Sequence, residues 1–184
     1  MKKIFLGSLV GAILLFGWQS LSWTVLGIHD KAMSYTPAQD SLLSTLGNTL
    51  KQEGQYILPT LPPNSSREDY EKLATSMEGK PWAMVTFHET HHNDMLMNMI
   101  RGFLTCFVCV WLCCVIIGRQ QNKGFYNGFS TALIFGLVSF LFVWYIGHIW
   151  MGIGWYILKG EMIDALVGWG LSGIWLGWWY SRRS

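Results

Sequence analysis

The sequence predicts an all-α integral membrane protein, in which four transmembrane helices form a bundle and a small helical extracytoplasmic cap joins the first helix to the second. Hydrophobic residues make up 51% of the 184 residues and charged residues only 13%, whereas a soluble domain carries about 25% charged residues. An α-helix needs about 20 mainly apolar residues to cross a hydrocarbon core of roughly 30 Å. Four stretches without Asp, Glu, Lys or Arg approach or exceed this length, and they cover residues 4–28, 102–118, 124–158 and 165–181.

The first span is expected within residues 1–28, directly after Lys2 and Lys3. A cleaved secretory signal is the alternative interpretation of such a segment. The apolar run is longer than the roughly 7–15 residues of a signal-peptide core, and no small-x-small cleavage site follows it. We therefore expect a retained membrane anchor.

The cap is expected at residues 29–98 and contains two helix-start patterns. Thr36, Pro37 and Gln39 have the spacing of a capping box with proline at the first helical position, and Gly54 suits the helix end. Ser65 with Glu68 forms a second capping-box pattern. The apolar positions of these two helices are Leu42, Leu43, Leu46 and Leu50, and then Tyr70, Leu73, Ala74 and Met77. Each set lies on one helical face.

Two other parts of the cap cannot be ordinary helix. Residues 56–63 include three prolines, which remove backbone donors and restrict the preceding residues, so this stretch is expected to be extended. Residues 82–87 are apolar, aromatic and partly β-branched, which favours either a short extended segment or a lid packed on the membrane surface.

The membrane region is expected at residues 99–184, with spans at about 99–118, 124–150 and 162–181. The 35-residue stretch 124–158 would make about 50 Å of helix, so its glycines Gly147, Gly152 and Gly154 predict either a break near the outer face or a helix that projects from the bilayer. Gly7 with Gly11, and Gly173 with Gly177, have the GxxxG spacing that allows close helix approach.

The basic residues predict the orientation, because loops rich in Lys and Arg remain cytoplasmic. With both termini cytoplasmic, every acidic residue lies outside, and the inside holds Lys2, Lys3, Arg119, Lys123, Arg182 and Arg183. We expect a bacterial inner-membrane protein. The net charge of +2 is explained by these anchors, so no nucleic-acid surface is predicted.

Residues 88–92 read HETHH and satisfy the pattern HExxH. In these five residues the chain resembles the zinc metalloproteases. The resemblance implies that His88 and His92 bind Zn²⁺ from one helical face and that Glu89 is the general base. A third ligand would come from His148, Glu161 or Asp164. The alternative is that the histidines are ordinary interfacial residues.

A second metal hypothesis uses sulfur ligands. Met95, Met97 and Met99 precede the span that holds Cys106, Cys109, Cys113 and Cys114. Thioether and thiolate groups suit Cu(I), so Met95 and Met99 with Cys106 and Cys109 are candidate copper ligands. Methionine and cysteine are also common apolar residues in membranes.

Arg101 is expected either to pair with Glu161 or Asp164 in the outer leaflet or to act as an interfacial anchor, because charge near the bilayer requires a partner or access to water. For the whole chain, the sequence favours a non-catalytic role. We expect an accessory or assembly subunit that contacts the lipid bilayer and packs against other membrane subunits or further copies, through glycine faces and aromatic rims. A zinc-dependent membrane hydrolase and a copper-handling protein are the alternatives.

Overall fold

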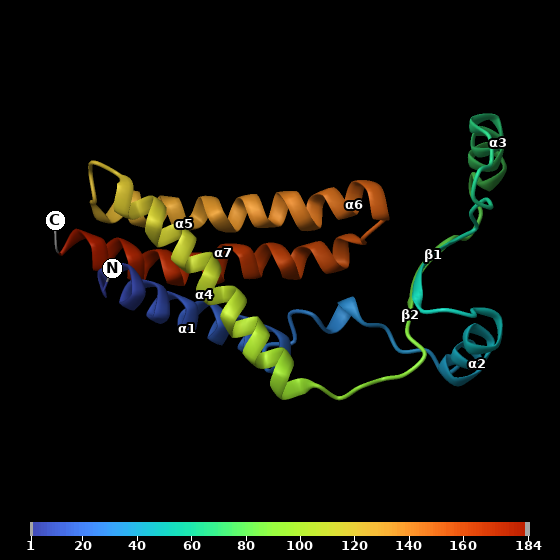
Figure 1. Cartoon of the computed structure of the whole chain (residues 1–184), viewed down its shortest axis with the longest axis horizontal. Helices are drawn as coiled ribbons and strands as arrows, with labels where there is room; N and C mark the ends of the chain where they lie inside the picture. Colours follow the sequence, from blue (N-terminus) through green and yellow to red (C-terminus); the bar gives the residue numbers. More distant parts are fainter. Residues whose placement is uncertain (1, 183–184) are drawn as a thin grey trace. The chain divides into compact units, whose positions relative to one another are not determined.

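The computed structural model describes residues 2–182 and is mostly helical. In chain order its elements are α1 (Lys2–Thr24), the 3₁₀ turn η1 (Asp30–Ala32), α2 (Gln39–Thr49), β1 (Gly54–Leu58), α3 (Arg67–Met77), β2 (Ala83–Phe87), α4 (Met95–Arg119), α5 (Phe125–Ser139), the π-helical turn η2 (Phe140–Tyr145), α6 (Ile146–Met151) and α7 (Trp155–Ser181). Figure 1 shows these elements along the chain. They form two compact units, a membrane unit (residues 2–34 and 94–182) and a cap unit (residues 35–93).

Three helices of the membrane unit are long and apolar enough to cross a membrane, and they comprise residues Lys2–Thr24, Met95–Arg119 and Phe125–Met151. The structure therefore supports an integral membrane protein with transmembrane helices. Helix α7 is also long, at 27 residues. It is not one of these three, and the charged residues Lys159, Glu161 and Asp164 lie in its first half.

The long third stretch ends as a helix at Met151, so the predicted break near residue 152 is confirmed. Gly152 takes a left-handed backbone conformation with φ of 66°, which only glycine adopts without strain. The chain then turns through Gly154, and α7 begins at Trp155. Inside the stretch, the π-helical turn at residues 140–145 separates α5 from α6.

Helix α1 packs against α4 and α7, and α7 packs against α5. Glycines allow the closest approach: a Cβ atom at Gly128 of α5 would lie 2.8 Å from Cα of Gly177 on α7. On α1, a Cβ atom at Gly11 would lie 2.7 Å from a methyl group of Val110 on α4. Both predicted GxxxG pairs thus lie at close contacts between helices of this one chain.

The start of α1 and the end of α7 lie at the same end of the membrane unit (Figure 1). The Nε1 atom of Trp179 donates a hydrogen bond to the carbonyl oxygen of Lys3 over 3.0 Å. The hydroxyl group of Tyr180 donates to the carbonyl oxygen of Cys114, which lies near the end of α4. Arg183, one of the predicted cytoplasmic anchors, lies outside the described residues.

The cap unit contains two helices and one two-stranded antiparallel sheet, in which Gly54 pairs with Phe87 and Leu58 with Ala83. The expected extended character of residues 82–87 is confirmed for β2. The capping-box prediction at Ser65 and Glu68 is wrong by one residue. Ser66 and Asp69 form the box, because Ser66 Oγ accepts from the Asp69 amide and the Asp69 carboxylate accepts from the Ser66 amide.

The first cap helix also differs from its prediction at both ends. It begins at Gln39 after Ala38, and it ends at Thr49 rather than near Gly54. The Thr36 hydroxyl group accepts a hydrogen bond from the Ala38 amide over 3.3 Å, so it stabilises a turn before the helix instead of capping the helix itself. Gly54 is used by β1.

Candidate functional site

A cluster of buried polar side chains joins α1, the segment after α1, and α7. The carboxylate of Asp164 accepts hydrogen bonds from Trp18 Nε1 over 2.9 Å and from the Ser22 hydroxyl group over 2.5 Å. Its second oxygen lies 3.0 Å from Nε2 of His29. Only 7% of Asp164 and 3% of His29 is exposed. Because a buried carboxylate is stable only with donors around it, these three partners account for its presence in an apolar region.

Local backbone and ring contacts place His29 in this cluster. Gly27 has φ of 62°, and this left-handed turn reverses the chain after α1. The His29 ring then stacks on Trp23 with centroids 4.0 Å apart and an interplanar angle of 6°. On α7, a Cβ atom at Gly160 would lie 2.8 Å from the His29 ring. The imidazole ring therefore lies between the indole ring of Trp23 and the backbone of α7 at Gly160.

Ser22, His29 and Asp164 do not form a catalytic triad, although the three residue types are those of one. Nε2 of His29 faces both the Asp164 carboxylate and the Ser22 hydroxyl oxygen, the latter at 3.1 Å. A triad needs the carboxylate on one ring nitrogen and the nucleophile on the other. The Ser22 hydroxyl group also donates to Asp164, so no base is arranged to activate it. The cluster instead fixes the segment after α1 to α7 through the contact of His29 with Asp164.

Glu161 extends the cluster toward a small cavity. Its Oε1 atom lies 3.9 Å from Nδ1 of His29, and both atoms are buried without a hydrogen-bond partner among the described residues. The adjacent cavity has a volume of about 100 Å³ and is lined by Glu161 and Asp164, with Gln19 and Ser139 among the other lining residues. At this distance the imidazole and the carboxylate are close enough for an ion pair but are not hydrogen-bonded to each other.

The sequence prediction for Arg101 as partner of these carboxylates is wrong. Arg101 lies exposed on α4, and within residues 2–182 the ion pairs of Asp164 and Glu161 are both with His29. The interpretation of Arg101 as an interfacial anchor stays a prediction.

Trp18 and Ser22 have i and i+4 spacing and share a helical face. This spacing is the one sequence signal that could have indicated two hydrogen-bond donors for the carboxylate of Asp164.

The HExxH residues lie between β2 and α4, in a segment that is not helical. The side chains of His88, Glu89 and His92 are exposed. His88 Nδ1 lies 3.9 Å from a carboxylate oxygen of Glu53, and His92 Nε2 lies 3.0 Å from the Thr90 hydroxyl oxygen. Without a helix, positions i and i+4 have no common face, so this segment as placed does not provide the zinc geometry that the pattern implies.

His148 belongs to the membrane unit, where its Nδ1 atom lies 2.6 Å from the carbonyl oxygen of Ile153. Its ring packs beside Tyr145 and Trp155. Throughout the described part of the chain, no three His, Cys, Asp or Glu side chains are grouped so that they could hold a metal ion. His148 therefore stabilises the turn between α6 and α7.

The candidate copper ligands lie along α4 in two environments. Met95 and Met99 are exposed near its start, whereas Cys106 is buried and Cys109 is partly buried. The Cys106 thiol group donates a hydrogen bond to the side-chain oxygen of Gln19 over 3.3 Å. All four cysteines of the chain are free thiols. Cys106 thus contributes to the contact between α4 and α1.

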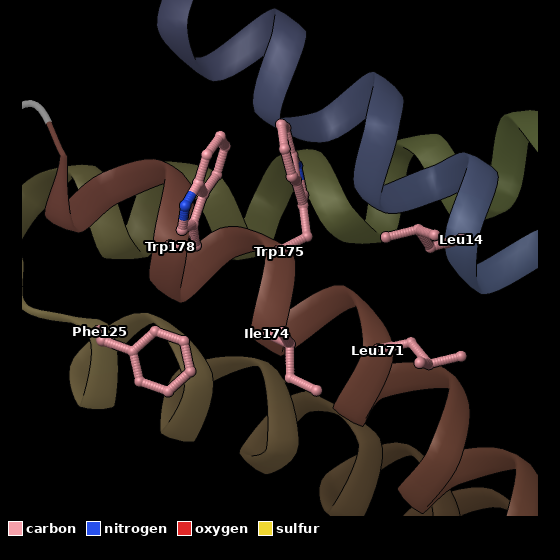
Figure 2. A pocket seen from close by; sticks show the side chains of 6 residues that line it. All are labelled: Leu14, Phe125, Leu171, Ile174, Trp175 and Trp178. Atoms are coloured by element: carbon pink, nitrogen blue, oxygen red, sulfur yellow. The ribbon is translucent and has the colours of Figure 1, made fainter.

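Each of the two units also has an apolar hollow. One is a groove of about 490 Å³ in the membrane unit, shown in Figure 2 and lined by Leu14, Phe125, Leu171, Ile174, Trp175 and Trp178. The other is a cleft of about 350 Å³ in the cap unit, formed by β1, α3 and nearby residues, with Ile57, Tyr70, Leu73, Met77 and Trp82 among its lining.

Comparisons of this chain with protein-family models, with curated proteins and with solved structures found no match.

Proposed function

We propose that this chain is a non-catalytic integral membrane protein, an accessory or assembly subunit, and that its cap unit binds a protein partner. One observation carries the proposal: no other element of the cap unit covers the apolar faces of α2 and α3. Leu42 and Leu43 of α2 and Tyr70 of α3 are exposed, Leu43 to 62%. Helices with an apolar stripe are normally stabilised by burial of that stripe.

The cap unit has almost no core of its own. Phe87 is its one buried hydrophobic residue among residues 35–93, and the pairing of β1 with β2 is its only extensive contact between elements. A domain of about 60 residues is marginally stable even when it buries its apolar side chains. Burial of the α2 and α3 stripes against another protein would supply the missing core.

The charge of the cap favours a protein over the lipid headgroups as the partner. Residues 35–93 carry seven acidic and four basic side chains. Anionic headgroups attract basic segments and repel acidic ones. A protein surface with an apolar centre and a basic rim would match both the stripes and the acidic surroundings.

We further propose four membrane spans, with α7 as the fourth. At about 1.5 Å per residue its 27 residues would extend about 40 Å, enough for a crossing. Its acidic residues Glu161 and Asp164 are buried inside the membrane unit, where polar groups are tolerated when they have partners. Loops rich in Lys and Arg stay in the cytoplasm, so both termini would be cytoplasmic and the cap extracytoplasmic, in a bacterial inner membrane.

Purification of the full chain in mild detergent, with the mass of the complex measured by light scattering, tests the cap proposal. The informative variant is Leu43→Glu, and its matched control is Asn48→Glu, which adds the same charge on the other face of α2. We expect the wild type and Asn48→Glu to elute in a stoichiometric complex that Leu43→Glu loses. A monomer in every mild detergent, or a complex that Leu43→Glu leaves unchanged, would contradict the proposal. A complex with the mass of two copies would identify the partner as a second copy of the chain.

A further inference from the structure

The groove in Figure 2 runs along one face of α7 and has only apolar side chains around it. Its α7 members have the spacing i, i+3, i+4 and i+7, and they are Leu171, Ile174, Trp175 and Trp178. Seven residues of helix correspond to about 10 Å of length. Leu14 closes the groove from α1, and Phe125 closes it from the start of α5.

Hydrogen bonds hold the aromatic wall of the groove in place. Nε1 of Trp175 donates to the carbonyl oxygen of Gly7 on α1 over 3.0 Å. The Trp175 ring also stacks against Trp179 with centroids 5.2 Å apart, and Trp179 is itself bonded to the Lys3 carbonyl oxygen. With its indole N–H satisfied, Trp175 presents a fixed apolar surface. The groove is therefore formed before any ligand enters it.

One end of the groove is positively charged. Arg182 follows α7, and its guanidinium group lies 4.5 Å from the centre of the Trp178 ring, which lines the groove. Lys123 is two residues before Phe125 in the chain. Lys2 and Lys3 begin α1 at the same end, where Lys3 lies over the Tyr180 ring. No Asp or Glu residue occurs in residues 1–29, 95–160 or 165–184, so the acidic side chains of the chain belong to other segments.

We propose that this groove is a binding site for an anionic phospholipid, with one acyl chain along α7 and the phosphate headgroup at Arg182 and Lys123. The apolar lining offers no hydrogen bond to a polar ligand, and its volume of about 490 Å³ is in the usual range for small-molecule sites. A basic group at the mouth of a cleft between membrane helices is the arrangement that selects anionic headgroups. The phosphate is that of a lipid, because only a lipid would also fill the apolar part.

Native mass spectrometry of the full chain in detergent tests the site with two lipids of identical acyl chains, phosphatidylglycerol and phosphatidylcholine. We expect the wild type to retain the anionic lipid about fivefold better, the value for one basic side chain near a membrane surface. Arg182→Ala leaves Lys123 beside the headgroup and should lower this preference severalfold, and Arg182→Lys should retain it. Arg101→Ala, which removes an exposed arginine from α4, should leave the preference unchanged.

A second pair of variants tests the acyl-chain part. Ile174→Trp fills the groove and should lower retention of both lipids severalfold. Leu166→Trp adds the same ring at an exposed position elsewhere on α7 and should behave as the wild type; circular dichroism confirms that both variants are folded. Equal retention of the two lipids by the wild type, or unchanged retention by a folded Ile174→Trp, would overturn the proposal. A protein that occupies the groove, detected as a bound chain lost in Ile174→Trp with no lipid effect, would also overturn it.

Discussion

At Asp164, donors from three points of the chain meet one carboxylate: Trp18 and Ser22 on α1, and His29 after it. The sequence shows that an acidic residue so close to an apolar stretch needs a partner, and pairing with Arg101 was one of two alternatives, the other being that Arg101 is an interfacial anchor. The pairing alternative is wrong, and the sequence did not indicate His29 because its position depends on the turn at Gly27 and on its stacking against Trp23. Neither contact has a signal in helical periodicity.

Replacement of Asp164 by leucine should destabilise the membrane unit by about 3–5 kcal/mol, the cost of removing one partner of a buried ionic pair. Three buried donors would lose their acceptor. Asp164→Asn keeps one side-chain oxygen and should have a smaller effect. The measurement is the free energy of unfolding in mixed detergent, followed by tryptophan fluorescence. Asp30→Asn, at an exposed acidic residue in η1, is the control; if it costs as much as Asp164→Leu, the cluster does not stabilise the unit.

Asp69 provides a pH-dependent contribution in the cap unit. Hydrogen bonds from the Ser66 hydroxyl group and the Ser66 amide lower the pKa of the Asp69 carboxyl group. Because the pKa is lower in the folded helix than in the unfolded chain, this stabilisation is present above the unfolded pKa of about 3.9 and is lost as pH falls through the folded pKa.

We therefore expect the amides in the first turn of α3 to exchange faster between pH 5 and pH 3, after correction for intrinsic exchange rates. The measurement is hydrogen exchange of the full chain by mass spectrometry. In Asp69→Asn the same amides should show no such additional acceleration. A wild-type first turn with equal protection at both pH values would be incompatible with the capping box as a pH-dependent element.

At the scale of elements, the four long helices of the membrane unit and both cap helices could be predicted as helices from charge-free runs and apolar periodicity, to within a few residues. The capping residues were displaced by one or two positions because Ser65 and Ser66 are adjacent, and Thr36 can stabilise a turn as well as a helix. The ladder between β1 and β2 joins residues about 30 apart. The apolar and β-branched composition of residues 82–87 predicted a possible extended segment. It does not indicate which other segment pairs with these residues.

The contact between α5 and α7 depends on the absence of a side chain at Gly128. A Cβ atom there would meet the backbone of Gly177 at 2.8 Å, and backbone cannot move aside as a flexible side chain can. Gly128→Ala should therefore destabilise the membrane unit by about 1–3 kcal/mol through overpacking.

The control for that substitution is Gly170→Ala on α7, where a Cβ atom would make only an ordinary contact, at 4.0 Å from a methyl group of Leu133. Alanine in a helix interior is favoured over glycine by up to about 1 kcal/mol, so this variant should be as stable as the wild type or more stable. Thermal unfolding in detergent compares the two. Equal melting temperatures for both variants would mean that the two helices are not held at this distance.

At the scale of the whole molecule, composition was sufficient to predict a membrane protein, and three apolar helices support this. The fourth span, α7, stays a proposal. The charge-free run 165–181 predicts it, and its acidic residues Glu161 and Asp164 are buried inside the membrane unit. Trp18, Ser22 and His29 are the partners of Asp164 there, and periodicity along the chain does not show these tertiary contacts.

The number of crossings can be measured by the sidedness of two single-cysteine probes, Asn122→Cys between α4 and α5 and Ser181→Cys at the end of α7, with a third, Ser76→Cys, in the cap. If α7 crosses, the first two positions lie on the same side of the membrane, because two crossings separate them. In intact cells an impermeant maleimide should then label the Ser76→Cys probe alone, and permeabilised cells should show all three. The four native cysteines lie in α4, so the probes are introduced after replacement of these thiols by alanine. Labelling of Ser181→Cys but not Asn122→Cys in intact cells would establish three crossings, and the buried carboxylates of α7 would then need an explanation outside the hydrocarbon core.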